Sequence, residues 1–286
     1  MKNKSGNTAF GAASVRLMEQ LEPGDKKLFN DPVIYHLTSP VIRFIIKSKF
    51  LRNYFVRQSD KIIPGIIGGQ ICRTKFIDEK TLQVLNEVQQ ILILGAGLDT
   101  RAYRLEGIDQ KSIYEVDLPY IQQNKITGLK KYFGKLPSEV HFIPIDFNTQ
   151  KTETVLENSS FDINKSTLVI LEAVIQYINK EAVDEVFKFI SKLPNNSYLL
   201  FTYILRDIIE RKTEGADKII NWSEKKHCPF VFGINPSELK SFLESYNIEL
   251  LEDVGTEFYQ ENYLQPLNRN MNVFHGERTS FARINK

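Results

Sequence analysis

The sequence predicts an open, doubly wound α/β fold, in which helices cover both faces of a mostly parallel β-sheet. The first observation behind this prediction is a series of short apolar runs without alternating polar positions, as expected for parallel strands that are buried on both faces. The second is the even spacing of these runs, which leaves room for roughly one strand–helix unit each. The runs start near residues 91, 113, 140, 167 and 198. A helical pattern with one apolar face, residues 180–193, lies between the last two.

Length and composition indicate a globular protein and limit the classes of partner that it is expected to bind. Hydrophobic residues make up 42% of the 286 residues and charged residues 25%, which excludes a wholly disordered chain. The formal net charge is only +2, so contact with nucleic acid or an acidic membrane would need a local basic patch. No apolar run approaches the roughly 20 residues of a membrane span, and the N-terminal residues lack the apolar segment of a secretory signal. We therefore expect neither a membrane nor a nucleic acid as a partner.

Cysteine and histidine usage limits the chemistry further. Cys72 and Cys228 lie far apart, which excludes a disulfide framework and the usual zinc modules and suits a reducing cytoplasm. The four histidines show no metal-binding spacing. The sequence also lacks a GxSxG elbow and a phosphate-binding P-loop. It therefore predicts a cytoplasmic protein without a metal and disfavours the hydrolase and P-loop classes.

Residues 1–88 precede the predicted sheet and are expected to form a helical cap. Residues 41–56 repeat apolar side chains at three- and four-residue steps, with four basic residues and no acid. Two interpretations stay open for this helix: a cover over the sheet or active site with snorkelling basic side chains, or a helix that binds a membrane surface or RNA. Asp78 is predicted to cap a further helix that runs to about Val88 and leads into the first strand.

The segment after the fifth strand is longer than a simple crossover needs. Residues 204–222 are predicted to form one long helix, and Asn235 with Glu238 forms the capping box of the next. Residues 248–254 and 278–284 are expected to be the final strands. The predicted single domain, residues 1–286, divides into the cap 1–88, a cofactor-binding α/β core 89–203, lid or insertion helices 204–247 and C-terminal strands 248–286. The cap and the insertion would cover the carboxyl ends of the strands, where ligands bind in such sheets.

The segment ILILGAGLDTRAYRL carries the clearest functional signal. A buried strand leads directly into Gly95, Ala96 and Gly97 and then into a helix-like stretch, and the glycines allow a sharp turn and close approach of a ligand. A dinucleotide fingerprint would have a third glycine three positions later, but Thr100 stands there. The neighbouring Asp99 would repel a pyrophosphate, and could instead accept hydrogen bonds or cap the helix. The pattern favours a cofactor without phosphates, S-adenosylmethionine.

Acidic residues end the next three predicted strands. Asp117 stands twenty residues beyond Gly97, where an acid can accept both ribose hydroxyls of a nucleoside. Asp146 ends the third strand, within reach of an adenine amino group, and Glu172 ends the fourth, near the charged methionine portion. Each acid alone could be a helix cap or a solvated rim residue. Together with the glycine turn, they indicate a cationic ligand rich in hydroxyl groups.

The whole layout resembles the leucine carboxyl methyltransferase family. This family includes the enzymes that methylate the C-terminal leucine of type-2A protein phosphatases and bacterial polyketide O-methyltransferases of the tetracenomycin type. The similarity covers nearly the full chain, and the combination of RTKFID, GAGLDTR and EVDLP in that order is specific. The matching segments are SVRLMEQLEPGDKKLFNDP at 14–32, GGQICRTKFID at 68–78, QQILILGAGLDTRAYRL at 89–105, YEVDLPYIQQNK at 114–125, IPIDF at 143–147, ILEAVIQYI at 170–178 and FGINPSELKSFL at 232–243.

The resemblance implies S-adenosylmethionine as the cofactor and gives roles to individual residues. Arg73 matches the arginine that binds the carboxylate of the methionine portion, a task that suits its planar guanidinium. The other implied cofactor contacts are Gly95, Ala96 and Gly97 in the turn, Asp117 at the ribose, Asp146 and Phe147 at the adenine, and Glu172 after the fourth strand. Arg16 matches a basic residue that contacts the cofactor from the N-terminal arm. Ala173 departs from the glycine that the family often has after this glutamate.

The predicted reaction is a direct displacement that moves a methyl group from a sulfonium to an oxygen of a small-molecule or peptide acceptor. Such a step depends mainly on alignment and desolvation. A carboxylate acceptor is ionised at neutral pH and needs no base, whereas a phenol needs a base or a nearby cation. Tyr177 and Tyr203 could line the acceptor site or only pack, so the catalytic residues stay unassigned.

Three alternatives stay open. A nicotinamide-dependent oxidoreductase would use the same sheet, although Thr100 and the lack of GxGxxG argue against it. A non-catalytic partner-binding protein would keep the fold and methylate nothing. An RNA methyltransferase has support only from the basic residues of segment 41–56, and the balanced net charge argues against it.

Overall fold

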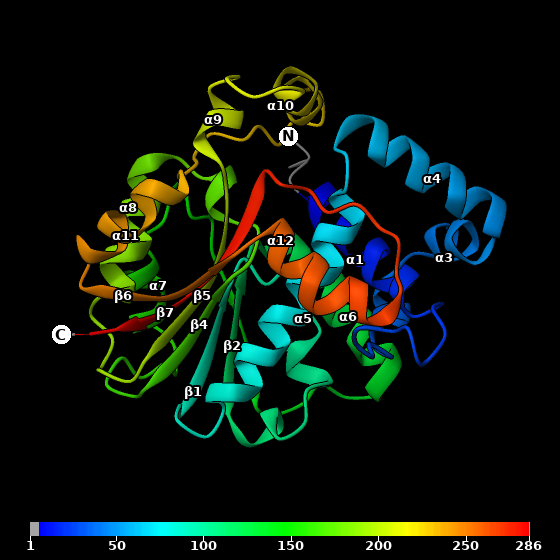
Figure 1. Ribbon diagram of the computed structural model, residues 1–286. Coiled ribbons are helices and arrows are strands. Elements are labelled where there is room, and N and C mark those ends of the chain that lie inside the picture. Colours follow the sequence, from blue (N-terminus) through cyan, green and yellow to red (C-terminus); the bar gives the residue numbers. More distant parts are fainter. Residues whose placement is uncertain (1–5, 286) are drawn as a thin grey trace.

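The computed structural model describes residues 6–285, which fold around a seven-stranded β-sheet (Figure 1). The strands are β1 Gln90–Leu94, β2 Ser112–Asp117, β3 Val140–Pro144, β4 Thr167–Leu171, β5 Tyr198–Ile204, β6 Ile248–Val254 and β7 Glu277–Ile284. Their order across the sheet is β3-β2-β1-β4-β5-β7-β6. Strands β1 to β5 are parallel, and β7 runs antiparallel to both β5 and β6. The predicted α/β class is confirmed, and the five predicted apolar runs are the five parallel strands.

Helices cover both faces of this sheet (Figure 1). The α-helices are α1 Gly6–Glu19, α2 Ile34–Leu37, α3 Pro40–Lys47, α4 Lys49–Ile62, α5 Ile66–Val84, α6 Pro119–Phe133, α7 Thr152–Glu157, α8 Lys180–Ile190, α9 Arg206–Ile209, α10 Ala216–Lys225, α11 Pro236–Glu244 and α12 Thr256–Tyr259. Five short helical turns are η1 Arg101–Tyr103, η2 Ile108–Gln110, η3 Ile175–Tyr177, η4 Gln260–Leu264 and η5 Gln265–Leu267. Residues 1–5 of the predicted cap and Lys286 lie outside the described residues.

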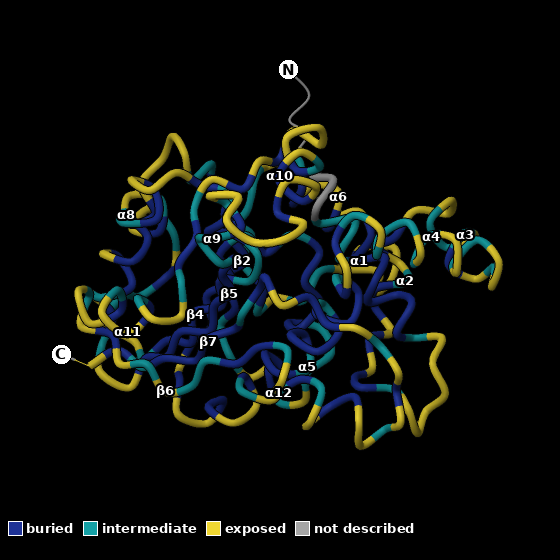
Figure 2. The backbone as a smooth tube through the Cα atoms, turned by 45° about the horizontal axis from the view of Figure 1, so that its top comes forward, coloured by how far each residue is buried: buried dark blue, intermediate teal, exposed yellow. Residues whose placement is uncertain are grey.

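The sheet is buried because its central strands carry apolar side chains on both faces. Every residue of β1, β4 and β5 is buried, and Figure 2 shows β4 and β5 in dark blue. Ile91 and Ile93 of β1 belong to the apolar cluster shared with α1 and α5. Leu92 and Leu94 belong to the cluster shared with α8 and α11. Alternate side chains of one strand thus stabilise two separate layers, which explains the continuous apolar runs.

The predicted starts of two helices on one face are confirmed. Asn179 caps α8, since its side-chain oxygen accepts the N–H of Ala182 at 2.8 Å. Asn235 and Glu238 form the capping box at the start of α11. The predicted final strands are also confirmed as β6 and β7, which close the sheet beside β5.

The prediction of a single helix over residues 41–56 is wrong. The structure has two helices there, α3 and α4, with Ser48 between them. Ser48 has an extended backbone (φ −75°, ψ 113°), and its hydroxyl accepts the N–H of Leu51 at 3.5 Å. Ser48 therefore ends one helix and caps the next. The apolar periodicity hid this break because serine is tolerated inside a helix as well as at a cap.

Asp78 does not cap a helix, contrary to the prediction. It lies inside α5, which starts after Gly65 and ends at Val84 instead of Val88. The Asp78 carboxylate accepts hydrogen bonds from two arginines that follow β1. An acid that looked like a cap in the sequence therefore forms tertiary ion pairs.

The prediction of one long helix over residues 204–222 is also wrong. Strand β5 continues to Ile204, because its backbone pairs with β7 up to Glu277. Two shorter helices, α9 and α10, follow, and Gly215 immediately before α10 has a left-handed backbone (φ 79°). The break has a local cause, since a left-handed residue ends the helical repeat.

Candidate functional site

A cavity of about 940 Å³ opens at the carboxyl ends of the parallel strands. It is lined by all eight residues expected at the cofactor, namely Arg73, Gly95, Ala96, Gly97, Asp117, Asp146, Phe147 and Glu172. These residues come from α5 and from the segments that follow β1, β2, β3 and β4. The volume lies near the upper end of the roughly 300–1,000 Å³ of small-molecule sites, which leaves space for more than a single small ligand.

The turn after β1 requires glycine at two positions. Gly95 and Gly97 have left-handed backbones, with φ of 67° and 47°. A Cβ atom on Gly95 would lie 2.3 Å from Cγ2 of Val174, and one on Gly97 would lie 3.3 Å from the Cβ of Ala9 in α1. The predicted helix-like stretch after this turn is only the three-residue η1. Asp99 stabilises that short turn by accepting the N–H of Arg101 at 2.7 Å.

Asp117, at the end of β2, lies directly beside this turn. Its Oδ2 accepts the N–H of Gly97 at 2.5 Å, and its Oδ1 accepts the N–H of Leu118 at 2.6 Å. Burial raises the pKa of Asp117 above its ordinary value, and these two backbone hydrogen bonds offset only part of that effect. Each carboxylate oxygen keeps a lone pair for a further donor.

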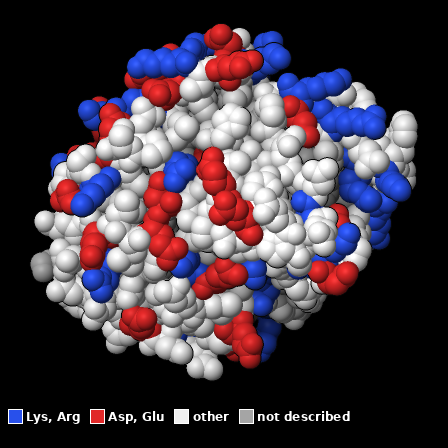
Figure 3. All heavy atoms as spheres, viewed as in Figure 1, with Lys and Arg blue, Asp and Glu red and all other residues white. Residues whose placement is uncertain are grey.

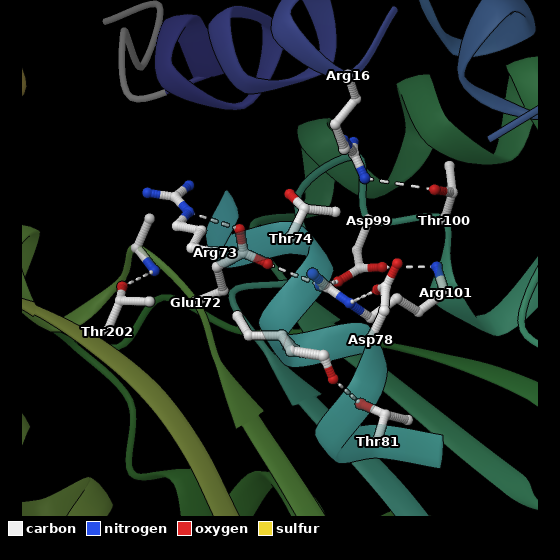
Figure 4. A network of polar contacts seen from close by, with 12 residues as sticks. Arg16, Arg73, Thr74, Asp78, Thr81, Asp99, Thr100, Arg101, Glu172 and Thr202 are labelled. Atoms are coloured by element: carbon white, nitrogen blue, oxygen red, sulfur yellow. Dashed lines mark hydrogen bonds and ion pairs between the residues drawn. The ribbon is translucent and has the colours of Figure 1, made fainter. Parts of the chain in front are cut away.

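Glu172 is held between two arginines, which point at it from opposite sides (Figure 4). Arg73 donates from Nε to Oε1 at 2.8 Å, and Arg101 donates from Nη1 to Oε2 at 2.7 Å. Burial opposes ionisation, but the charges of Arg101 and then Arg73 outweigh it and lower the pKa of Glu172 to about 2. Glu172 is therefore a fixed negative charge on the cavity wall at neutral pH.

Arg101 is the most heavily paired residue of this group. It is 1% exposed and contacts Asp78 at 2.8 Å, and it also pairs with Asp99 and Glu172. Burial alone would raise the pKa of Asp99, but the charges of Arg101, Lys125 and Arg16 lower it well below its usual range. A buried arginine is thus compensated by three carboxylates.

These contacts form one continuous chain of ion pairs, part of which Figure 4 shows and five members of which line the cavity. Its members, in order of contact, are Arg16, Asp31, Arg104, Asp78, Arg101 with Asp99, Glu172, Arg73 and Glu277. Four arginines therefore face five carboxylates in the chain. The excess negative charge suits a ligand with a net positive charge.

One nitrogen of Arg73 donates no hydrogen bond to a protein acceptor among residues 6–285. Its Nε donates to Glu172, and its Nη1 donates to both oxygens of Glu277. The remaining nitrogen, Nη2, is available for a ligand in the cavity, since Arg73 lines it. The geometry leaves an oriented guanidinium donor where an anionic group can bind.

Other residues considered in the sequence take different places. Arg16 of α1 lines the cavity and donates to the Leu98 carbonyl and to Thr100 Oγ1, the latter at 3.3 Å. Tyr177 also lines the cavity. The suggestion that Tyr203 lines the acceptor site is wrong, because its side chain is fully buried and its hydroxyl donates to Asp253 at 3.1 Å.

Two residues that form ion pairs with predicted cofactor residues had no predicted role. Arg101 received no role, although it stands in the GAGLDTR segment and could have been suspected from its place after the turn. Glu277 had no signal at all, because it begins β7 and reaches Arg73 only through the fold. Both are buried ionic groups: Arg101 pairs with nearby Asp99 but also with Asp78 and Glu172, and the partner of Glu277 lies 204 positions away.

Ala173, the residue after Glu172, has a left-handed backbone with φ of 55°. Its N–H donates to Thr202 Oγ1 at 2.8 Å, which ties the turn to β5. A side chain at such φ is strained, so the structure explains why glycine fits this position well.

Two features are absent from the described part of the chain. Among residues 6–285, no helix combines the length and apolar character needed to cross a bilayer. Within the same residues, no three His, Cys, Asp or Glu side chains gather as metal ligands do.

The strand order, the glycine turn and the acids at the strand ends define a class I methyltransferase fold. A solved DUF574 family protein from Streptomyces avermitilis is similar, with a TM-score of 0.61, 13% identity and 96% of each chain covered. A Thermobifida fusca structure described as a "putative methyltransferase" has a TM-score of 0.60 and 16% identity, and the match covers 92% of this chain and 98% of that one. The profile of the leucine carboxyl methyltransferase family matches residues 9–191. The chain belongs to the leucine carboxyl methyltransferase family.

Curated relatives agree with this assignment. A Mycobacterium bovis protein is 27% identical over 226 residues, which cover 76% of this chain and 70% of that protein. A Mycobacterium tuberculosis protein is 29% identical over 195 residues, which cover 66% of this chain and 61% of that protein. Both are named "Putative S-adenosyl-L-methionine-dependent methyltransferase". The predicted enzyme class is confirmed at the level of the family, which decides against the oxidoreductase alternative.

Proposed function

We propose that this chain transfers a methyl group from S-adenosylmethionine to a carboxylate or hydroxyl oxygen of a small molecule or peptide. The observation that carries the proposal is that all eight expected cofactor residues line one cavity whose remaining wall is largely apolar. The apolar wall includes Ile42, Phe55, Ile62, Ile66, Trp222 and Phe230. We further infer that segments 1–88 and 204–247 act as a cap and a lid over the core 89–203, and that these segments and the strands of 248–286 form one methyltransferase domain.

The cavity residues fit this cofactor in shape and charge. Gly97 leaves the backbone open beside Asp117, since a Cβ there would lie 4.0 Å from Asp117 Oδ2 and narrow the approach to the carboxylate. Asp117 would accept the ribose hydroxyls, and the open Nη2 of Arg73 would bind the carboxylate of the methionine portion. The cofactor carries two positive groups and one carboxylate, so its net positive charge suits the excess negative charge of the ion-pair chain.

The remaining contacts are assigned by position along the strand ends. Asp146 and Phe147 follow β3, where the carboxylate would accept the adenine amino group and the ring would pack against the base. Glu172 stays ionised because of Arg73 and Arg101, and it would face the ammonium group. Ala96 would contact the cofactor through the backbone of the turn.

When bound, S-adenosylmethionine supplies a methyl group on a positively charged sulfur, from which a nucleophile can displace it. The protein aligns the acceptor oxygen and excludes water. Tyr177 and Cys228 line the cavity, and burial raises the pKa of both side chains, so both stay protonated at neutral pH and neither acts as a base. A carboxylate acceptor with an apolar body would need no base, because a carboxylate is already ionised, whereas a hydroxyl acceptor would need another residue such as His227, which also lines the cavity.

Calorimetric titration with S-adenosylmethionine and with its demethylated product tests the cofactor assignment. Asp117→Asn is expected to weaken binding about tenfold or more, because it removes a charged acceptor. Asp109→Asn is the matched control, since Asp109 is an exposed acid before β2 and does not line the cavity. A wild-type chain that binds neither compound would remove the proposal.

The acceptor is tested with isotopically labelled S-adenosylmethionine, cell extract and mass spectrometry of the labelled product. A methyl ester releases labelled methanol in mild base, whereas a methyl ether does not. Label found on nitrogen, sulfur or carbon would contradict transfer to oxygen. His227 lines the cavity and could act as the base for a hydroxyl acceptor, whereas a carboxylate acceptor needs no base. His227→Gln should therefore reduce methyl transfer to a hydroxyl and leave methyl transfer to a carboxylate unchanged.

A further inference from the structure

Helices α3 and α4 carry the most exposed large apolar side chains found among residues 6–285. These are Val41 (66% exposed), Phe44 (69%), Phe50 (80%) and Tyr54 (59%), here called the apolar crest. Every other large apolar residue in the described part of the chain is at most 48% exposed. The two helices protrude beside α1, and Figure 2 shows much of their length as exposed. Exposed apolar groups gathered on one protrusion mark an interaction surface.

Basic side chains accompany the apolar crest. Residues 40–59 contain no Asp or Glu but five basic residues, Arg43, Lys47, Lys49, Arg52 and Arg57. None of the five forms an ion pair within residues 6–285. Figure 3 shows Lys and Arg gathered over this protrusion. The protrusion therefore carries a local excess of positive charge, although the net charge of the whole chain is nearly balanced.

The exposure of the crest is not a consequence of poor packing. The opposite side of the same helices is anchored, because Ile46 is 1% exposed and Ile42, Phe55 and Ile62 line the cavity. Each helix thus has an inner apolar side that belongs to the fold and an outer apolar crest that does not. The outer side chains have no partner to bury them in the described structure, so they are available to another surface.

We propose that α3 and α4 form an anchor that binds the surface of membranes rich in anionic lipids. Aromatic and aliphatic side chains can enter the headgroup region while the lysines and arginines, which have no carboxylate partner within residues 6–285, bind lipid phosphates and carboxylates. A second copy of the crest would bring like charges together. RNA would neutralise the cations but would leave Val41 and Phe44 in water. This proposal departs from the expectation of no membrane partner, which rested on net charge and on the absence of a span.

The test is sedimentation of the full chain with vesicles of phosphatidylcholine alone and of phosphatidylcholine containing phosphatidylserine. Binding is expected only with phosphatidylserine and should fall as the salt concentration rises. The double variant Phe44→Ser/Phe50→Ser is expected to lower the vesicle partition coefficient about tenfold or more. Lys47→Glu/Lys49→Glu should lower it about fivefold or more for each charge reversed.

Two matched controls use exposed residues of other elements. Leu251→Ser removes a 38% exposed apolar side chain from β6, and Lys240→Glu reverses a charge on α11 whose side chain is 77% exposed. Both should bind vesicles as the wild type does. Thermal unfolding of all variants identifies any that fail to fold. None of the substituted residues lines the cavity, so the cofactor site is left unchanged.

Several outcomes would overturn the anchor. These are no vesicle binding, equal binding to both lipid mixtures, or unchanged binding by folded variants of the crest. A gel shift of single-stranded RNA without vesicle binding would assign the surface to nucleic acid instead. A dimer that is lost in Phe44→Ser/Phe50→Ser, again without vesicle binding, would assign it to a second copy of the chain.

Discussion

Arg73 Nη1 donates to both carboxylate oxygens of Glu277, at 2.7 and 2.6 Å, although the two residues lie 204 positions apart. Arg73 belongs to α5 and Glu277 begins β7, so the pair ties a helix that precedes the sheet to the last strand within it. Both side chains are buried and both line the cavity. The pair orients the guanidinium that we assign to the cofactor carboxylate.

Replacing Glu277 by alanine is expected to destabilise the fold by about 3–5 kcal/mol, because it leaves the buried charge of Arg73 with less compensation. Chemical denaturation measures this change. The matched control is Lys188→Ala, since the Lys188–Asp184 pair is exposed and such pairs contribute about 1 kcal/mol or less. Equal losses of unfolding free energy in the two variants would show that the buried pair stabilises the fold no more than the exposed pair does.

Glu172→Gln should reduce the acid sensitivity of the fold. The pKa of Glu172 falls from its ordinary value of 4.5 to about 2 in the folded chain. A lowered pKa means that Glu172 stabilises the fold above pH 4.5 and that this contribution is lost as the pH falls toward 2. This stabilising contribution is on the order of 3 kcal/mol. The free energies of unfolding of wild type and variant, measured by denaturation at a series of pH values, should therefore converge as the pH falls from 4.5 toward 2. A constant difference over this range would contradict the lowered pKa of Glu172.

Gly97→Ala should weaken cofactor binding more than it weakens the fold. The left-handed backbone makes alanine cost about 1 kcal/mol, and the added Cβ also enters the space between Ala9 and Asp117. Gly134→Ala is the matched control, because Gly134 also has a positive φ (79°) but has no atom within 4 Å of the added Cβ. Calorimetry of both variants with S-adenosylmethionine should show an affinity loss only for Gly97→Ala. A similar loss in both would indicate a general effect of strain.

Ala173→Gly is expected to leave the fold unchanged or stabilise it by up to about 1 kcal/mol. Relief of the left-handed strain offsets the added entropy of the unfolded chain. Ala173→Val should destabilise it, since a β-branched residue tolerates positive φ poorly. Thermal unfolding of the two variants compares the effects directly. If Ala173→Val stabilised the fold, the positive φ would not determine which residue type is tolerated at this position.

Most of the sheet and the assembly of the predicted site residues could be read from the sequence. The strand runs reflect burial on both faces, and the eight proposed cofactor residues do converge on one cavity. The errors concern local signals with two meanings. Ser48 was compatible with a helix but separates two helices, and Asp78 looked like a cap but pairs with arginines. Tyr203 was considered for the acceptor site, but it lies within β5, where its hydroxyl donates to Asp253 away from the cavity.

By itself, the sequence determined the doubly wound sheet, the glycine turn after β1 and the acids at the strand ends. These features arise from local periodicity and from the backbone freedom of glycine, which neighbouring residues encode. Only the tertiary structure decided that Glu277 meets Arg73, that Arg101 joins three carboxylates and that the apolar crest faces outward. Those relationships depend on how distant segments pack, because ionic and apolar contacts form wherever the fold brings side chains together.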